Sequence, residues 1–348
     1  MSGGVAQLLA IGAQDSHLVG NPQASYFRST FKRHTNFSQS VESQTIQGNV
    51  QNGGISSVRF ERKGDLLSYI YLQPTTKTAS PSANVAITDW TKAISKVSLY
   101  IGGQLIDEQD STFSTLIAPK LCAQTYAKSR ASGLFGSGSA FYPIRFFNSE
   151  SFQDCIPLIS CQYHDVEIRI TWGSEAEASA WTCYANFIFL DTDERDYFAS
   201  TRQDIVITQV TKCVASAARI QELNFNHPVK AIAAANTGGV SLVGSTNRLK
   251  LQINGTDIGD YRYAHPNYTS VPLFYHTSFG DNDSLDDLFV YSFGLDVSKP
   301  FSTGTLNFSR LDSARIVSET ATSNDNIYAI GLNILRFENG LAGLLYSS

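Results

Sequence analysis

Short apolar runs that alternate with polar residues recur along most of the chain. Period-two alternation places successive side chains on opposite faces of an extended strand. Such runs are found at Val58–Phe60, Leu67–Leu72, Val97–Ile101 and Val166–Ile170. Glycine pairs or Asn-Gly pairs supply the positive φ angles that tight hairpins need, and they stand at Asn52-Gly53, Gly102-Gly103, Asn254-Gly255 and Asn339-Gly340. The pattern predicts an all-β protein.

Helical signals are few. Pro119 suits the first turn of a helix predicted to run to Lys128, and a short helical turn is predicted over Asp193–Ser200. So little helix excludes a parallel α/β fold. Two glycine-rich loops, Ala131–Ala140 and Asn236–Gly239, are expected at corresponding positions of two similar domains.

Two sequence marks recur at similar spacing. The pattern of Leu99–Gly103 returns at Leu251–Gly255, 152 residues later, and Tyr184-Ala185 returns as Tyr328-Ala329, 144 residues later. Both offsets are about one domain length and preserve the order of the marks. They predict an internal repeat.

The 348-residue chain is long enough for two domains, because single hydrophobic cores stop growing near about 250 residues. We therefore predict two consecutive eight-stranded antiparallel jelly rolls with few short helices. The N-terminal arm covers residues 1–25, the first jelly roll 26–200 and the second 201–348. The junction is expected between Asp191 and Ile205.

Composition restricts the function. The net charge of −5 and the absence of clustered Lys and Arg argue against nucleic-acid binding. Charged residues make up 16% of the chain, against about 25% in typical soluble domains. This shortage fits a surface hidden by assembly, and it equally fits an all-β protein that uses Thr, Ser, Asn and Gln on its solvent faces.

Nothing in the sequence predicts secretion or a membrane span. No basic residue precedes Arg28, and no apolar run approaches the roughly 20 residues that cross a bilayer. The five cysteines form no Cys-x-x-Cys pair, so we expect free thiols in a reducing compartment.

Catalytic and cofactor motifs are missing from the sequence. It has neither a Gly-x-Ser-x-Gly elbow nor a phosphate-binding Gly-x-x-x-x-Gly-Lys, and its six histidines lack metal-ligand spacing. The acidic segment Asp281–Asp287 resembles a calcium loop, but the sixth position is Asp286 and not Gly, which favours a solvated loop. We expect no catalytic residue, no metal and no cofactor.

An acidic cluster follows the apolar run that ends at Leu190. Asp191, Asp193 and Glu194 could serve as a glycosidase acid and nucleophile. With Arg195 beside them, they are better interpreted as helix caps and ion pairs that fix the angle between two domains. Sequons at Asn254, Asn267 and Asn282, and also at Asn36 and Asn307, are candidate glycosylation sites; without a signal peptide we interpret them as incidental.

Landmarks along nearly the whole chain resemble those of the major capsid proteins of large nucleocytoplasmic DNA viruses, the double jelly-roll group of algal viruses and iridoviruses. They include Gly12–Asp15, Gly20–Gln23, Arg33–Phe37, Gly64–Leu66, Ile101–Asp107, Pro157–Ile159, Gln162–Val166, Leu190–Arg195, Phe225–Lys230, Tyr291–Phe293 and Asn307–Arg310.

The resemblance implies a homotrimer in which six jelly rolls form a pseudo-hexagonal capsomer that tiles an icosahedral shell. It implies neighbouring capsomers, minor capsid and penton proteins and an internal viral membrane as partners, and assembly in the host cytoplasm. It also makes the arm, with Gln14, Asp15, Asn21 and Pro22, an assembly element at the capsomer base.

Three alternatives remain open at this point. Aromatic residues at Tyr261, Tyr263 and Tyr268 could stack on sugars in a tandem jelly-roll carbohydrate-binding or host-attachment protein. The chain is shorter than many family members, which leaves room for a minor or paralogous capsid subunit. A jelly-roll hydrolase rests only on scattered carboxylates.

Overall fold

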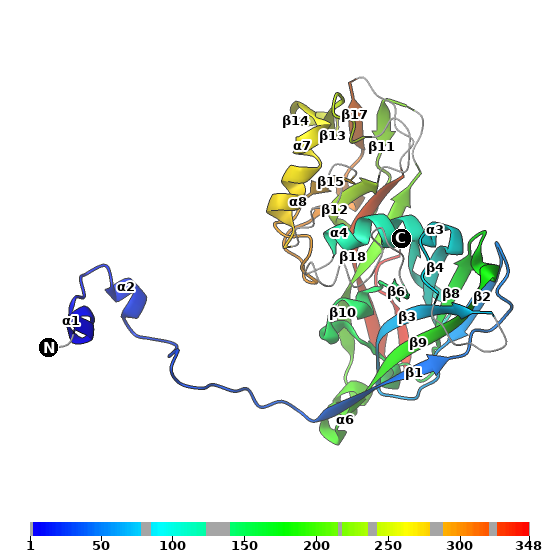
Figure 1. Ribbon diagram of the computed structural model, residues 1–348, viewed down its shortest axis with the longest axis horizontal. Helices are drawn as coiled ribbons and strands as arrows, with labels where there is room; N and C mark the ends of the chain where they lie inside the picture. Colours follow the sequence, from blue (N-terminus) through cyan, green and yellow to red (C-terminus); the bar gives the residue numbers. More distant parts are fainter. Residues whose placement is uncertain are drawn as a thin grey trace. The chain divides into compact units, whose positions relative to one another are not determined.

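The computed structural model describes residues 3–77, 85–122, 140–214, 218–235, 242–278, 288–319 and 326–347. The chain divides into two units, Met1–Asn36 and Phe37–Ser348. The first unit is longer than the arm of residues 1–25 expected from the sequence, and the name arm is used for all of it below. It contains two short helices, α1 (Gly3–Leu9) and α2 (Ser16–Val19) (Figure 1). Its apolar side chains are largely exposed, including Leu18 at 84% and Tyr26 at 98%.

The first jelly roll consists of two antiparallel sheets (Figure 1). Sheet I has the order β1 (Phe37–Gln44), β9 (Ser179–Leu190), β3 (Leu66–Thr76), β6 (Tyr142–Ile144), and the short β7 (Ile156–Pro157) also pairs with β3. Sheet II has the order β2 (Ile55–Arg59), β8 (Val166–Trp172), β4 (Ile94–Ile101), β5 (Gln104–Asp110).

The second jelly roll repeats this arrangement. Sheet III has the order β10 (Gln203–Cys213), β18 (Ile327–Glu338), β12 (Pro228–Ala235), β15 (Leu288–Ser292), with β16 (Leu306–Asn307) on β12 and β19 (Leu341–Leu344) on β18. Sheet IV has the order β11 (Ile220–Glu222), β17 (Ala314–Ser318), β13 (Arg248–Ile253), β14 (Thr256–Tyr263).

The two rolls share one topology. Leaving aside the short β7, β16 and β19, each roll has eight principal strands, and in both rolls one sheet has the order first, eighth, third, sixth and the other second, seventh, fourth, fifth. Both repeated sequence marks fall on equivalent strands. Leu99 and Leu251 lie in β4 and β13, the fourth strands, and Tyr184 and Tyr328 lie in β9 and β18, the eighth strands. The predicted double jelly roll and its internal repeat are confirmed.

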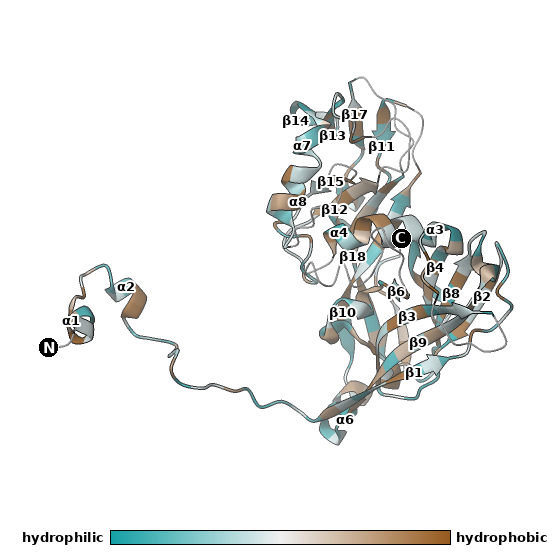
Figure 2. Ribbon diagram, in the orientation of Figure 1, coloured by the Kyte–Doolittle hydropathy of each residue, from teal (hydrophilic) through white to brown (hydrophobic). Residues whose placement is uncertain are grey.

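Alternating apolar residues build the cores. In β8, Val166, Ile168, Ile170 and Trp172 are buried, while the residues between them are at least partly exposed. β12 departs from this rule, because every residue from Val229 to Ala235 is buried. Figure 2 shows apolar residues along the central strands of both rolls. A strand buried on both faces needs a cover on its outer side.

Helices are short and lie in the connections. They are α3 (Trp90–Ala93), α4 (Ala118–Leu121), α6 (Thr192–Ser200), α7 (Ala264–Asn267), α8 (Ser270–His276), the π-helical turn η1 (Phe113–Ile117), and the 3₁₀ turns η2 (Phe147–Ser149), η3 (Phe152–Asp154), η4 (Leu158–Ser160), η5 (Ala176–Ala178) and η7 (Phe308–Arg310). The turn predicted over Asp193–Ser200 is confirmed as α6. The helix predicted from Pro119 begins one residue earlier, and residues 123–128 lie outside the described part.

One expectation about the connections is wrong. The segment 131–140 lies between β5 and β6, the fifth and sixth strands of its roll, whereas 236–239 lies between β12 and β13, the third and fourth. These glycine-rich segments, whose residues 131–139 and 236–239 lie outside the described residues, therefore belong to different connections. Their composition alone carries no information on strand order.

Candidate functional site: the junction between the two jelly rolls

The connection from the first roll to the second is the helix α6. Asp191 caps its N-terminus, since the Asp191 Oδ1 accepts a hydrogen bond of 2.8 Å from the Thr192 N–H. Asp193 and Glu194 occupy the first helical turn, where negative charge interacts favourably with the helix dipole. Asp191 is thus a helix cap. That the cluster as a whole fixes the angle between the two domains stays a prediction.

Arg195 binds Asp65, a residue of the landmark Gly64–Leu66 for which the sequence predicted no role. Its Nε lies 3.0 Å from Asp65 Oδ1, and the Asp65 side chain is only 10% exposed. The other oxygen of Asp65 accepts 2.9 Å from the Leu190 N–H, at the end of β9. Farther along α6, Ser160 Oγ donates to the Phe198 carbonyl at 2.6 Å. These bonds hold the connecting helix on the first roll.

A second set of contacts joins β5 of the first roll to β10 of the second. The Val210 N–H donates to Asp107 Oδ1 at 2.9 Å, and the Gln209 amide donates to the Ile106 carbonyl. Gln109 Nε2 donates to the other Asp107 oxygen at 2.8 Å. Burial raises the pKa of Asp107 to about 7, although the hydrogen bonds from Val210, Gln109 and the Glu108 N–H favour its charged form.

At the end of β5, Asp110 receives two groups from the second roll. The Tyr328 hydroxyl donates to Asp110 Oδ2 at 2.7 Å, and Lys212 Nζ lies 2.9 Å from the same oxygen. Burial, and after it the neighbouring Asp110 charge, raises the pKa of Tyr328. The hydroxyl therefore stays protonated and keeps donating.

The first roll also supplies a helical cover. η1 and α4 bury Phe113, Ile117 and Leu121 against the outer face of sheet III. In that sheet the covered β12 residues are Ala231, Ala233 and Ala235, whose small side chains permit close approach. This cover explains why β12 is buried on both faces.

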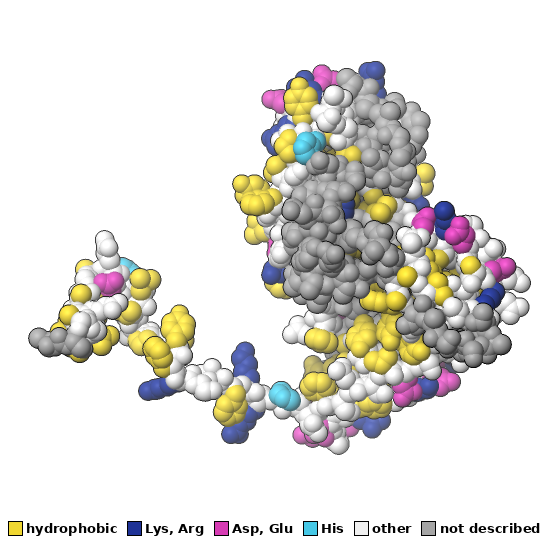
Figure 3. Space-filling view, in the orientation of Figure 1, with side chains coloured by type: hydrophobic (Ala, Val, Ile, Leu, Met, Phe, Trp, Pro, Cys, Tyr) yellow, Lys and Arg dark blue, Asp and Glu magenta, His cyan; other side chains and the backbone are white. Residues whose placement is uncertain are grey.

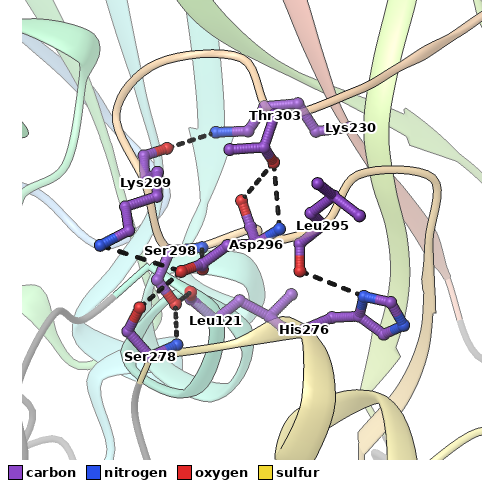
Figure 4. Close-up of polar contacts among 9 residues, drawn as sticks. All are labelled: Leu121, Lys230, His276, Ser278, Leu295, Asp296, Ser298, Lys299 and Thr303. Carbon is purple, nitrogen blue, oxygen red and sulfur yellow. Dashed lines mark hydrogen bonds and ion pairs between the residues drawn. The ribbon is translucent and has the colours of Figure 1, made fainter. Parts of the chain in front are cut away.

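The segment Asp296–Lys299, which follows β15, forms hydrogen bonds to the end of α4 and to β12 (Figure 4). The Asp296 carboxylate accepts 2.9 Å from the Ser298 N–H, and Ser298 Oγ donates to the Leu121 carbonyl at 3.0 Å. Lys230 Nζ donates to the Lys299 carbonyl at 2.8 Å. Hydrogen bonds thus run from the second roll to the end of α4.

A small cavity of about 100 Å³ lies between the rolls, and the charged residues Arg145, Glu150 and Lys230 are among its lining residues. Burial raises the pKa of Glu150 to about 7, while the positive charges of Lys230 and Arg145 oppose this shift. Among the described residues, no group of three or more His, Cys, Asp or Glu side chains could hold a metal ion.

The C-terminal strand β19 returns to the first roll. Gln104 Oε1 accepts 3.1 Å from the Leu344 N–H, and the Tyr163 N–H donates to the Gly340 carbonyl at 3.0 Å. His164 Nδ1 lies 2.9 Å from the Ala342 carbonyl. The two rolls therefore share an extensive contact. Its hydrogen bonds, ion pairs and apolar packing hold the rolls together.

In the arm, Asp15 Oδ2 accepts 2.8 Å from the Gly12 N–H. Asn21 has a φ of 48°, and Gln14 and Pro22 are exposed. Among the residues that the structure covers, no helix is long and apolar enough to cross a membrane.

The candidate sequons lie in different settings. Asn254 is exposed at the β13–β14 turn, and its Oδ1 accepts from the N–H groups of Asp312 and Ser313. Asn267 is half-buried, with Nδ2 donating to the Tyr263 carbonyl. Asn282 and the acidic segment 281–287 lie outside the described residues.

Tyr268, one of the three aromatic residues proposed to stack on sugars, is buried. Tyr268 is only 7% exposed and stacks on Phe289 with ring centroids 5.7 Å apart. It belongs to the core of the second roll, so it offers no ring face to a sugar.

Comparisons with known proteins agree on one family. A family model described as the N-terminus of the major capsid protein matches residues 25–205. The chain is 30% identical to a major capsid protein of Pyramimonas orientalis virus and 28% identical to one of Paramecium bursaria Chlorella virus 1, each match covering 100% of both chains.

Solved structures share the fold. A chain of the PBCV-1 virus capsid superposes with a TM-score of 0.77 at 23% identity, covering 93% of this chain and 100% of that one. The Faustovirus major capsid protein superposes with a TM-score of 0.63 at 11% identity, covering 94% of each chain.

Proposed function

Because this chain belongs to the family of major capsid proteins of nucleocytoplasmic large DNA viruses, we propose that three copies of it form one capsomer with a nearly hexagonal outline. Its role is that of a structural protein in the capsid shell of the virion. In the proposed capsomer, six jelly rolls alternate around a ring, two from each chain, and the capsomers tile an icosahedral shell.

The observation that supports this proposal most strongly is that one chain contains two jelly rolls of the same topology, which are held together by an extensive contact. Both rolls have the same strand order. Asp107 and Asp110 of β5 bond to β10 and β18, so the rolls are held together at a buried contact. Two similar units at a fixed angle let three chains present six similar edges, which approximates sixfold packing.

Partners beyond the trimer belong to the same proposal. Neighbouring capsomers contact its sides, because many weak lattice contacts add up through multivalency. The arm exposes Leu8, Leu9, Leu18, Tyr26 and Phe27; we assign it to contacts with minor capsid or penton proteins, or with an internal membrane beneath the shell. Assembly in the host cytoplasm, without catalytic activity and without direct nucleic-acid binding, completes the proposal.

Light scattering across a concentration series of the purified chain tests the trimer. We expect a stable species of three times the 38.1 kDa chain mass. A chain that remains monomeric at the highest concentration contradicts the proposal. The full-length matches to major capsid proteins support a major rather than a minor role in the shell.

A further inference from the structure

Inside the chain, one roll covers the other with a defined element. η1 and α4 follow β5, the fifth strand of the first roll, and pack on the outer face of sheet III. The ring centroids of Phe113 and Tyr328 are 5.8 Å apart, and Tyr328 is only 1% exposed. The connection after the fifth strand of one roll thus covers the first–eighth–third–sixth sheet of the other.

The equivalent face of the first roll is sheet I, and it presents an apolar groove. The groove has a volume of about 730 Å³ and is lined by Tyr69, Tyr71, Phe141 and Phe152, among others. Tyr184, which repeats Tyr328, does not line the groove itself but pairs with Tyr71 of β3 and stacks on its ring at 5.2 Å, and both side chains remain partly exposed. Tyr69 is 38% exposed and Phe152 80%.

The equivalent cover belongs to the second roll. α7 and α8 follow β14, the fifth strand of that roll, as η1 and α4 follow β5. α8 carries Phe274, Tyr275 and Val271, which are 77%, 71% and 40% exposed. Figure 3 shows apolar side chains gathered over α8 and, separately, over the region of β3 and β6. Each chain therefore has one apolar helix face and one apolar groove at pseudo-equivalent positions.

We propose that α8 of one copy packs into the sheet I groove of a second copy, and so repeats between chains the contact that η1 and α4 make within the chain. The inference rests on the proposed trimer and names its interface. Because helix and groove are different surfaces, the contact is heterologous, and a chain of such contacts closes into a ring when its rotation permits. Buried aromatic anchors are the residues that usually dominate such interfaces.

Two charge substitutions test the two sides of the contact. Phe274→Asp places a carboxylate on α8, and Tyr69→Asp places one in the groove. We expect each variant to raise the concentration at which the trimer dissociates at least about tenfold, because an unpaired charge would be buried in the contact. Ile55→Asp is the matched control, since Ile55 is 66% exposed on sheet II, and it should dissociate like the wild type.

The outcomes separate this inference from the proposed function. A wild-type chain that never trimerises contradicts both, before any variant is compared. A wild-type trimer with unchanged dissociation of either variant overturns the pairing of helix and groove. Circular dichroism checks that each variant is folded.

If a variant does not fold, a measurement on the wild type tests whether α8 packs into the sheet I groove. Oxidative footprinting above and below the concentration at which the trimer dissociates should find that Tyr69, Phe274 and Tyr275 lose reactivity on assembly, relative to Tyr163, which is 74% exposed. Reactivity at the two sites that changes no more than that of Tyr163 overturns the inference.

Discussion

A single carboxylate, Asp65, holds the end of β9 and the helix α6 together. It accepts from the Leu190 N–H and pairs with Arg195. We expect Asp65→Ala to lower the free energy of unfolding by about 2 kcal/mol, because a nearly buried acceptor with a charged partner is lost. Chemical denaturation measures the change. The exposed Asp196→Ala on α6 is the control and should stay within about 0.5 kcal/mol; equal losses in both variants would contradict the role of Asp65.

The buried Asp107 gives the protein a pH dependence of known sign. Burial raises its pKa from 3.8 to about 7 in the folded state. Between these values the folded state binds the proton more tightly than the unfolded state, so this contribution to stability is complete below about pH 4 and is lost as the pH rises to about 7. The slope is at most about 1.4 kcal/mol per pH unit.

The variant Asp107→Asn isolates this contribution. Denaturation curves recorded from pH 4 to 8 should show a shallower fall of stability in the variant than in the wild type. Glu150, whose pKa burial also raises to about 7, keeps part of the fall in both proteins. Identical pH profiles would show that Asp107 is ionised in the folded protein throughout this range.

Residue patterns predicted part of the junction. The cap at Asp191 was predicted, because capping depends on the next few residues only. The partner of Arg195 was not, because Asp65 lies just before β3, far away in sequence. Asp107 ends the landmark Ile101–Asp107 of the family resemblance, whereas Asp110 lies outside it, and the sequence carries no sign that β10 and β18 meet these two residues.

At the scale of elements, the β4–β5 hairpin supports the contact with β19. Gly102 has a φ of +58°, and a Cβ there would overlap the ring of His164, which binds the backbone of Ala342. We expect Gly102→Ala to destabilise the protein by about 3 kcal/mol, from backbone strain plus displacement of His164. Thermal unfolding of the purified variant measures this loss.

The adjacent glycine provides the control for this experiment. Gly103 has a φ of +81°, but its Cβ would meet no atom within 4 Å. Gly103→Ala should therefore cost only the backbone term, about 1 kcal/mol. If both variants lose the same stability, the contact with His164 contributes nothing.

Strand alternation predicted elements that have one solvent face and failed where a neighbour covers the second face. β8 alternates and was identified from its pattern. The run from Val229 to Ala235 does not alternate, because one face of this strand packs in the core of the second roll and η1 and α4 cover the other. Continuous apolar runs of small residues are therefore a signal of helical cover that alternation alone does not detect.

At the scale of the whole molecule, the cores of the two rolls are not separate. The core of the first roll includes Ile207, Leu335 and Phe337, which come from β10 and β18 of the second roll. The repeat predicted two similar folds but not this sharing, because it arises from packing between residues more than one hundred positions apart. Shared burial links the stability of one roll to that of the other.

We therefore expect the two rolls to unfold in one transition. All three tryptophans, Trp90, Trp172 and Trp181, lie in the first roll, so their fluorescence reports on that roll, whereas far-ultraviolet circular dichroism reports on both. Phe289→Ala removes a ring from a core cluster made only of second-roll residues and should cost about 3–5 kcal/mol. If the rolls unfold together, the fluorescence midpoint moves with the dichroism midpoint by the same amount of denaturant. A fluorescence midpoint that stays at its wild-type value while the dichroism curve shifts or splits would show that the first roll stands without the second, and that the contacts of Asp107 and Asp110 join two independently stable domains.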